Sequence, residues 1–259
     1  MPPCSTAGSG RAGRDPVRHP LFARCYARFS VAAETRLGMA GLRERLLAGL
    51  TGRVIEIGAG NGLNFAHYPG GVAEVVAIEP ERLLRHKAVA AALRADVPVD
   101  VVPGCAEALP VKSEAFDAVV FSLVLCSVHD VSRALAEARR VLRPGGEVRF
   151  FEHGVGGGRV MGLAQRALDR TVWPPLSGGC HLSRDPVAAL RAAGFVLGPY
   201  RRVLLPQTGP VLPSSYCALG TAWRPAADGR RNPGDGPGPG PRSRAAGEPG
   251  AGGRSGAGP

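Results

Sequence analysis

The sequence predicts an α/β fold with a doubly wound, mostly parallel sheet of seven strands that ends in a C-terminal antiparallel hairpin. Short runs rich in Val and Ile alternate with stretches of helical length and periodicity through the middle of the chain. Strands that are buried on both faces of a parallel sheet are apolar throughout, and the helices between them form the crossovers. The last two strand-like runs are separated only by residues 206–213, which is too short for a crossover helix and favours a hairpin.

The individual elements follow from apolar periodicity and from turn and cap residues. Apolar side chains spaced close to 3.6 residues apart in 20–50 predict one or two helices. Seven strands are expected at 53–57, 75–78, 99–102, 118–125, 147–152, 195–205 and 215–223. Three further helices are expected at 81–95, 132–142 and 186–193. Ser183 or Asp185 is the expected N-cap of the last helix, and Gly194 follows its end.

Composition confines this fold to the middle of the 259-residue chain. The last 35 residues, from Pro225, contain 11 Gly and 7 Pro but no aromatic residue and no Val, Ile, Leu or Met. Such a segment cannot bury enough apolar area to offset its ordering entropy. Residues 225–259, a Gly/Pro/Arg-rich tail, and residues 1–16 are therefore predicted to be disordered, which leaves 17–224 as a single domain.

Charge and cysteine usage exclude several classes of protein. The formal net charge is +11, but 30 of the 32 basic residues are Arg and they are scattered, so nucleic acid is not expected as a partner. No apolar run approaches the roughly 20 residues of a membrane span, and the N-terminus lacks the apolar core of a secretory signal. The six cysteines show no metal-ligand or disulfide-framework spacing. We therefore expect a cytoplasmic protein with reduced thiols and no metal site, whose oligomeric state the sequence does not indicate.

A glycine loop and a carboxylate form the strongest local motif. Gly58, Gly60 and Gly62 follow the strand at 53–57, in a position where the backbone must approach a ligand closely. Glu79 ends the next strand, 17 residues after Gly62. A carboxylate at that point can accept hydrogen bonds from both ribose hydroxyls of an adenosine-containing ligand.

Two other nucleotide-binding classes lack their defining residues. A short-chain dehydrogenase needs Tyr-x-x-x-Lys, but the residues four positions after the tyrosines are Ser30, Val72, Leu204 and Gly220. A P-loop phosphotransferase needs glycines before Lys-Ser, and Lys112-Ser113 has none at that spacing.

Three further segments follow the glycine loop and Glu79 in the chain, namely Gly104–Pro110, Phe116-Asp117 and Arg140–Gly146. Together with the motif, they resemble the class I S-adenosylmethionine-dependent methyltransferases of the methyltransferase type 11 group. The resemblance covers roughly residues 50–150. More narrowly, Leu123–Val128, Phe151–His153 and Gly179–Arg184 are similar to the methyltransferase-like thiol methyltransferases.

The resemblance implies a Rossmann-like methyltransferase fold and S-adenosylmethionine as the cofactor. It places Gly58, Gly60 and Gly62 along the methionine portion, with Glu56 supporting the loop or meeting the amino group. Glu79 would bind the ribose, and Leu123 would lie beside the sulfonium. Many relatives have an Asp for the adenine where this chain has Cys105, so Ala106, Glu107 or apolar neighbours would hold the adenine instead.

The implied acceptor is a small, partly apolar molecule, with a thiol favoured over an oxygen or a lipid amine. Because the sulfonium is already activated, a base is needed only to remove the acceptor's proton. The candidates for this base are His181, His153 and Glu152, and Trp173–Leu176 is expected in a loop that covers the substrate. A nucleic-acid methyltransferase and a catalytically silent cofactor-binding protein of the same fold remain as alternatives.

Overall fold

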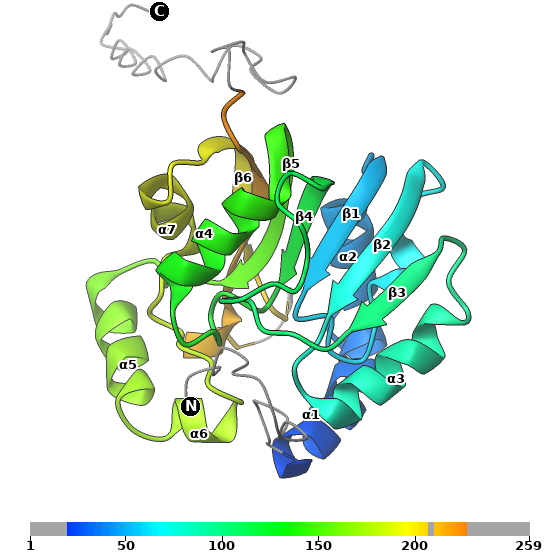
Figure 1. Ribbon diagram of the computed structural model, residues 1–259. Coiled ribbons are helices and arrows are strands. Elements are labelled where there is room, and N and C mark those ends of the chain that lie inside the picture. The colour runs from blue at the N-terminus through cyan, green and yellow to red at the C-terminus, as the bar shows by residue number, and fades with distance from the viewer. Residues whose placement is uncertain (1–19, 207–209, 227–259) are drawn as a thin grey trace, which may run out of the picture.

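The computed structural model describes residues 20–206 and 210–226, and it confirms the predicted α/β architecture (Figure 1). One sheet of seven strands runs in the order β3-β2-β1-β4-β5-β7-β6. The disorder predicted for residues 1–16 concerns residues outside the described part of the chain. The same is true of the predicted tail, 225–259, beyond its first two residues.

All seven predicted strands are present, and most of them differ from the prediction only at their ends. They are β1 Gly52–Ile57, β2 Val72–Ile78, β3 Val99–Val102, β4 Phe116–Ser122, β5 Leu142–His153, β6 Val196–Leu204 and β7 Tyr216–Trp223. The first five are parallel to one another, whereas β7 pairs antiparallel with both β5 and β6. The predicted C-terminal hairpin is therefore confirmed.

The helices agree with the sequence prediction up to the end of β5. They are α1 Pro20–Arg36, α2 Met39–Leu47, α3 Arg82–Ala92, α4 Val131–Val141, α5 Arg159–Asp169, α6 Trp173–Leu176 and α7 Pro186–Ala192. Short 3-10 turns, η1 Phe65–His67 and η2 Pro213–Ser215, complete the set in the described chain. Asp185 is the N-cap of α7, and its side chain accepts from the N–H groups of Val187 and Ala188.

Two elements between β5 and α7 differ from the prediction. Residues 159–169 form α5, which the sequence analysis did not predict. The segment Trp173–Leu176 forms the short helix α6, so the expected loop there is wrong. The adjacent prolines Pro174 and Pro175 lie in the first turn of α6, where the missing N–H of proline removes no helical hydrogen bond.

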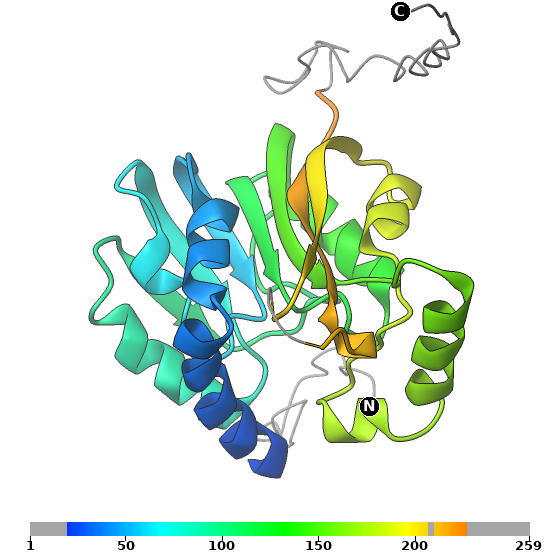
Figure 2. The ribbon, with the colours of Figure 1, turned by 180° about the vertical axis from the view of Figure 1, so that it is seen from behind.

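Helices cover both faces of the sheet, and each face has its own apolar core. On one face, Leu135 of α4 and Leu190 of α7 pack with Phe150 of β5 (Figure 1). On the other face, Leu46 of α2 packs with Val54 of β1, and the blue helices α1 and α2 lie in front in the reverse view (Figure 2). The carboxyl ends of the parallel strands meet at one edge between these two layers.

Candidate active site

The candidate site lies at the carboxyl ends of β1, β2, β4 and β5. The chain runs from β1 outward to β3 and then returns to place β4 on the other side of β1. In doubly wound sheets, ligands bind in the crevice at this reversal of strand order. Both the glycine loop after β1 and the turn after β4 lie here.

The three glycines of the loop after β1 have different physical reasons for lacking a side chain. All three have positive φ, of 70° at Gly58, 60° at Gly60 and 78° at Gly62. A Cβ would lie 2.6 Å from the Val124 side chain at Gly58 and 2.7 Å from the Phe65 ring at Gly62. The packing of the loop therefore already requires glycine at 58 and 62. At Gly60 the nearest atom would be 3.4 Å away, on the ring of Tyr26.

Glu79 closes this loop from the end of β2. It is 5% exposed, and its two oxygens accept from the backbone N–H groups of Gly60 at 2.7 Å and Glu81 at 2.8 Å. Burial raises the pKa of Glu79 to about 7, because these two bonds offset only part of the desolvation. Each carboxylate oxygen can accept more than one hydrogen bond, so capacity for ribose hydroxyls remains.

Glu56 lies beneath the loop, where its carboxylate accepts hydrogen bonds at 2.7 Å from both the Asn64 amide and the Tyr68 hydroxyl. The Asn64 carbonyl in turn accepts from the Arg43 guanidinium. Of the two roles expected for Glu56, these contacts agree with support of the loop. Burial raises the pKa of Glu56 to about 7.

This raised pKa predicts how stability depends on pH. The folded protein holds the Glu56 proton more tightly than the unfolded chain, so the contribution of Glu56 to stability falls as pH rises from about 4.5 to 7. A shift of this size corresponds to about 3 kcal/mol. Glu56→Gln, which is neutral at every pH, should increase the free energy of unfolding at pH 8 and flatten its pH dependence. Denaturant unfolding between pH 4.5 and 8 measures both effects.

Glu44→Gln, at an exposed position of α2, is the control for net charge. If the free energy of unfolding of Glu56→Gln depended on pH as steeply as that of wild type, the raised pKa would not belong to Glu56.

The residues expected at the adenine have other contacts in the structure. The Glu107 carboxylate accepts from the backbone N–H groups of His129 at 2.9 Å and Asp130 at 3.3 Å, just before α4. Ala106 is buried in the core beside α4. Cys105 is disulfide-bonded, so the expectation of reduced thiols is wrong at this position. Cys25, Cys126, Cys180 and Cys217 are free thiols.

The turn after β4 is held in an unusual backbone conformation. Leu123 has φ 61°, and its N–H donates to the Phe151 carbonyl at 2.7 Å. A non-glycine residue in the left-handed region costs of order 1–3 kcal/mol and persists only where its surroundings impose it. The strand therefore ends at Ser122, whereas the sequence had predicted an end at Leu125.

The Glu152 carboxylate holds the turn after β4 in this backbone conformation. Its side chain is fully buried and accepts from three consecutive backbone N–H groups, those of Val124 at 2.7 Å, Leu125 at 3.0 Å and Cys126 at 3.2 Å. Burial raises the pKa of Glu152, although the three donors counteract part of this effect. The carboxylate expected as a base thus holds the 123–126 turn together.

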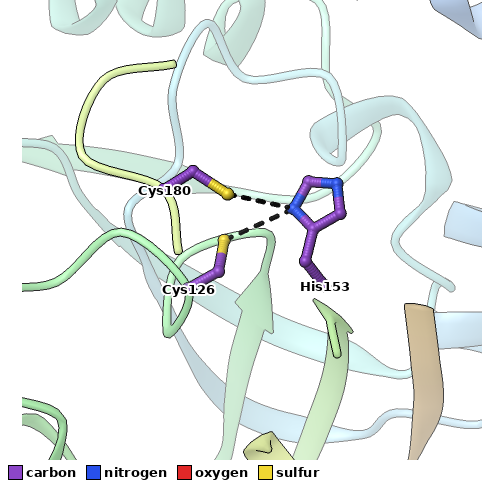
Figure 3. A group of neighbouring side chains, drawn as sticks. All are labelled: Cys126, His153 and Cys180. Carbon is purple, nitrogen blue, oxygen red and sulfur yellow. Dashed lines mark hydrogen bonds between the residues drawn. The ribbon is translucent and has the colours of Figure 1, made fainter. Parts of the chain in front are cut away.

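His153 faces two cysteine side chains that are distant in sequence (Figure 3). Its Nδ1 is 3.5 Å from Cys126 Sγ and 3.4 Å from Cys180 Sγ. The hydrogen bond with Cys180, together with burial, raises the pKa of the Cys126 thiol well above its ordinary value. Burial alone would lower the pKa of His153, but the Cys126 contact and the Glu152 carboxylate raise it. The local spacing of Cys and His along the chain gives no sign of this cluster, because its members are distant in sequence.

His181 is near this group, but its ring is directed elsewhere. Its Nδ1 donates to the Gly179 carbonyl at 2.8 Å, and its backbone N–H donates to the Cys126 carbonyl at 2.7 Å. The second bond joins the segment before α7 to the turn after β4. Of the three expected base candidates, only His153 thus lies beside the two cysteines.

A cavity of about 190 Å³ adjoins the cluster. Its walls are formed by Leu125, Cys126, Val131, Ser132, His153, Arg184, Asp185, Pro186 and Ala189. The 123–126 turn therefore has Val124 against Gly58 of the glycine loop and Cys126 in the wall of this cavity.

Sequence reasoning missed Tyr26. This half-buried side chain of α1 lies beside Gly60, within electrostatic range of Glu79 and Cys126. Burial raises its pKa. The only sequence signal was the helical periodicity of 20–50, which says nothing about the site.

Comparison with known proteins identifies relatives of this fold and sequence. Residues 55–150 match the family model described as methyltransferase domain. The chain is 34% identical over 171 residues to human thiol S-methyltransferase TMT1A, an alignment that covers 64% of this chain and 68% of the human protein. It is 30% identical over 205 residues to the ubiquinone/menaquinone biosynthesis C-methyltransferase UbiE of Syntrophotalea carbinolica, covering 73% and 84%.

The thiol S-methyltransferases are matched over only part of their length, down to 59% for rat TMT1B. Among solved structures, an S-adenosylmethionine-dependent methyltransferase from Mesorhizobium loti has a TM-score of 0.55 at 20% identity, covering 74% of this chain and 99% of the other. This likeness concerns the fold alone. Within the described residues, no helix is both long and apolar enough to cross a membrane.

Proposed function

We propose that this chain, which belongs to the S-adenosylmethionine-dependent methyltransferases, transfers a methyl group to the sulfur of a small, partly apolar thiol. S-Adenosylmethionine is the cofactor, and it supplies an activated methyl group. The residues of the glycine loop fit this ligand. Gly60 leaves space beside Tyr26 that a side chain would fill, and the Glu79 carboxylate lies at the end of the neighbouring strand.

The observation that carries the proposal is the position of the 123–126 turn. Val124 packs on the cofactor loop at Gly58, while Leu125 and Cys126 line the cavity of about 190 Å³. The turn that Glu152 holds fixed thus contacts both the cofactor loop and the cavity proposed for the acceptor. Fixed alignment of acceptor and donor supplies most of what this reaction needs, because the methyl group is already activated.

The cavity suits a small apolar thiol. Most of its lining side chains are apolar, and His153 is the titratable group in its wall that borders both cysteines. A thiol of ordinary pKa, about 8.5, needs only modest help to ionise at neutral pH. The similarity to the thiol S-methyltransferases supports the same acceptor class. The cytoplasmic location expected from the sequence is part of this proposal, as is the absence of a nucleic-acid partner.

A turnover screen tests the acceptor. The purified chain is incubated with tritiated S-adenosylmethionine and a panel of small thiols, phenols and lipid amines, and the products are identified by mass spectrometry. Methylated thiols are the expected product. Transfer only to phenols or amines would overturn the thiol assignment and leave methyl transfer intact. Cofactor binding without any turnover would favour the silent binding protein instead.

Glu79→Ala should weaken binding of S-adenosylhomocysteine by about 1.5–3 kcal/mol, because charge-assisted hydrogen bonds to the ribose are lost. Part of this loss would come from the Gly60 N–H, which loses its acceptor as well. Calorimetry with an analogue that lacks the ribose hydroxyls separates the two effects. The analogue should bind wild type weakly and lose little more in the variant. An equal loss from both proteins on removing the hydroxyls would show that Glu79 does not bind the ribose.

A further inference from the structure

Cys126, His153 and Cys180 come from three separate segments, namely the turn after β4, the end of β5 and the segment before α7. Their ligand atoms all lie within 4.8 Å of one another, and no other such Cys, His, Asp or Glu group occurs among the residues that the structure describes. Both sulfur atoms are directed at the same ring nitrogen (Figure 3). We propose that these three side chains bind a zinc ion and that its remaining coordination position takes the sulfur of the acceptor thiol.

The two sulfur–nitrogen distances are those of a tetrahedral zinc site. Zinc binds cysteine sulfur at about 2.3 Å and histidine nitrogen at about 2.0–2.1 Å, so tetrahedral angles place sulfur and nitrogen about 3.6 Å apart. The observed separations from His153 Nδ1 are 3.5 Å to Cys126 Sγ and 3.4 Å to Cys180 Sγ. Both sulfur–nitrogen distances are therefore within about 0.2 Å of the value that the ion needs.

Hydrogen bonding alone explains this convergence poorly. A ring nitrogen carries either one proton or one lone pair, so Nδ1 can form one good hydrogen bond. The two cysteines are buried, and the sulfur that does not bond to Nδ1 has only weak partners, namely the other thiol and, for Cys126, the Ser127 hydroxyl at 3.5 Å. One shared cation satisfies both sulfurs and the nitrogen together. Thiolate and imidazole ligands also suit zinc better than magnesium or calcium.

The surrounding backbone fixes the ligands in place. Three N–H groups of the 124–126 segment bind Glu152, and the Arg184 guanidinium donates to the carbonyls of Leu125 at 2.8 Å and Val128 at 2.7 Å. The His181 N–H donates to the Cys126 carbonyl, which ties the Cys180 segment to the same turn. Such supporting contacts orient the ligands of metal sites. Glu152 and Arg184 are thus positioning residues.

Three protein ligands leave one position of a tetrahedral ion open, as in catalytic rather than structural zinc sites. Cys126 and His153 both line the cavity proposed for the acceptor, so the open position can face it. A thiol that binds zinc is deprotonated.

This inference rests on the proposed function. The acceptor thiol releases its proton to solvent as its sulfur binds zinc. That sulfur then forms a bond to the methyl carbon while the bond from the methyl carbon to the cofactor sulfur breaks. The electron pair of the broken bond stays on the cofactor sulfur, which becomes a neutral thioether. The methylated acceptor is also a neutral thioether, a weaker ligand than the thiolate, and leaves.

Metal content of the full chain is the first measurement. Protein purified under reducing conditions without chelator should contain about one zinc per chain by mass spectrometry of the metal. After chelator treatment, Co²⁺ should bind with the absorption bands of a tetrahedral thiolate site, and a small thiol should change those bands. A chain without zinc that also binds no Co²⁺, or a Cys126–Cys180 disulfide in the reduced preparation, would overturn the site.

Matched variants identify the ligands. Cys126→Ser and Cys180→Ser should each weaken zinc binding by more than about 100-fold, beyond the 10–100-fold typical of residues that only support a ligand. Cys217→Ser, at a buried free cysteine outside the cluster, should leave it unchanged. S-Adenosylhomocysteine binding by each variant shows that the fold is intact. Wild-type zinc affinity in either cluster variant would overturn the assignment.

The two proposals fail in different ways. Zinc at the cluster without methylation of any thiol would leave the metal site standing and overturn the thiol acceptor. Undiminished thiol methylation by zinc-free protein would overturn the catalytic role of zinc and leave the proposed function standing.

Discussion

Gly60→Val is expected to abolish S-adenosylmethionine binding, with a loss of at least about 100-fold, or roughly 2.7 kcal/mol. The reason is steric. A Cβ at this position would already lie 3.4 Å from the Tyr26 ring, so the γ-methyl groups of valine would occupy the space between α1 and the loop. Gly60 also has φ 60°, a conformation that a β-branched residue adopts only with strain.

A second glycine separates these two causes. Gly49 has φ 75°, but nothing lies within 4 Å of the position of its Cβ. Gly49→Val thus introduces comparable backbone strain away from the glycine loop. Calorimetry with S-adenosylhomocysteine and thermal unfolding of both variants make the comparison. Gly49→Val should lose stability and keep its affinity, whereas wild-type affinity in Gly60→Val would show that the loop does not line the ligand.

The fold could be predicted because its signals are local. Each buried strand is a short β-branched run, and Asp185 is a local cap for α7. The prediction failed at α5, where Gly162 interrupts the helical pattern and Gly158 precedes its first residue, so the segment had no clear start signal. It failed again at α6, because two consecutive prolines are more typical of a loop than of a helical turn.

The residues of the site that could be predicted from the sequence are likewise those whose signals are local. The glycine loop and Glu79 were predicted because they lie within one strand–loop–strand segment. The contacts of Glu152 were not, because its N–H partners lie 26–28 residues earlier in the chain. His153 lies 27 residues after Cys126 and 27 residues before Cys180. The parallel pairing of β4 with β5 and the bond from the His181 N–H to the Cys126 carbonyl help to bring the three side chains together. No pattern of short-range spacing could report this.

His153→Ala should lower thiol methylation at pH 7 by at least about 30-fold. Only about 3% of a thiol of pKa 8.5 is ionised at pH 7, so a site that ionises its acceptor fully gains about this factor. Loss of acceptor alignment adds to the decrease at every pH. Affinity for S-adenosylhomocysteine should barely change, because His153 contacts the two cysteines and not the glycine loop.

The pH dependence and a second histidine make this prediction specific. Above about pH 9.5 most of the acceptor ionises by itself, so the deficit of His153→Ala should narrow there to the part that comes from alignment. His181→Ala is the matched control, because its ring bonds to the Gly179 carbonyl and the backbone link to Cys126 survives the substitution. It should lose less than about tenfold, well below the 10²–10⁴-fold typical of a group that acts on the transferred proton. Steady-state rates of both variants from pH 6.5 to 10 test this directly. A deficit of His153→Ala that stays the same at every pH, or equal losses in the two variants, would remove His153 from the ionisation of the acceptor.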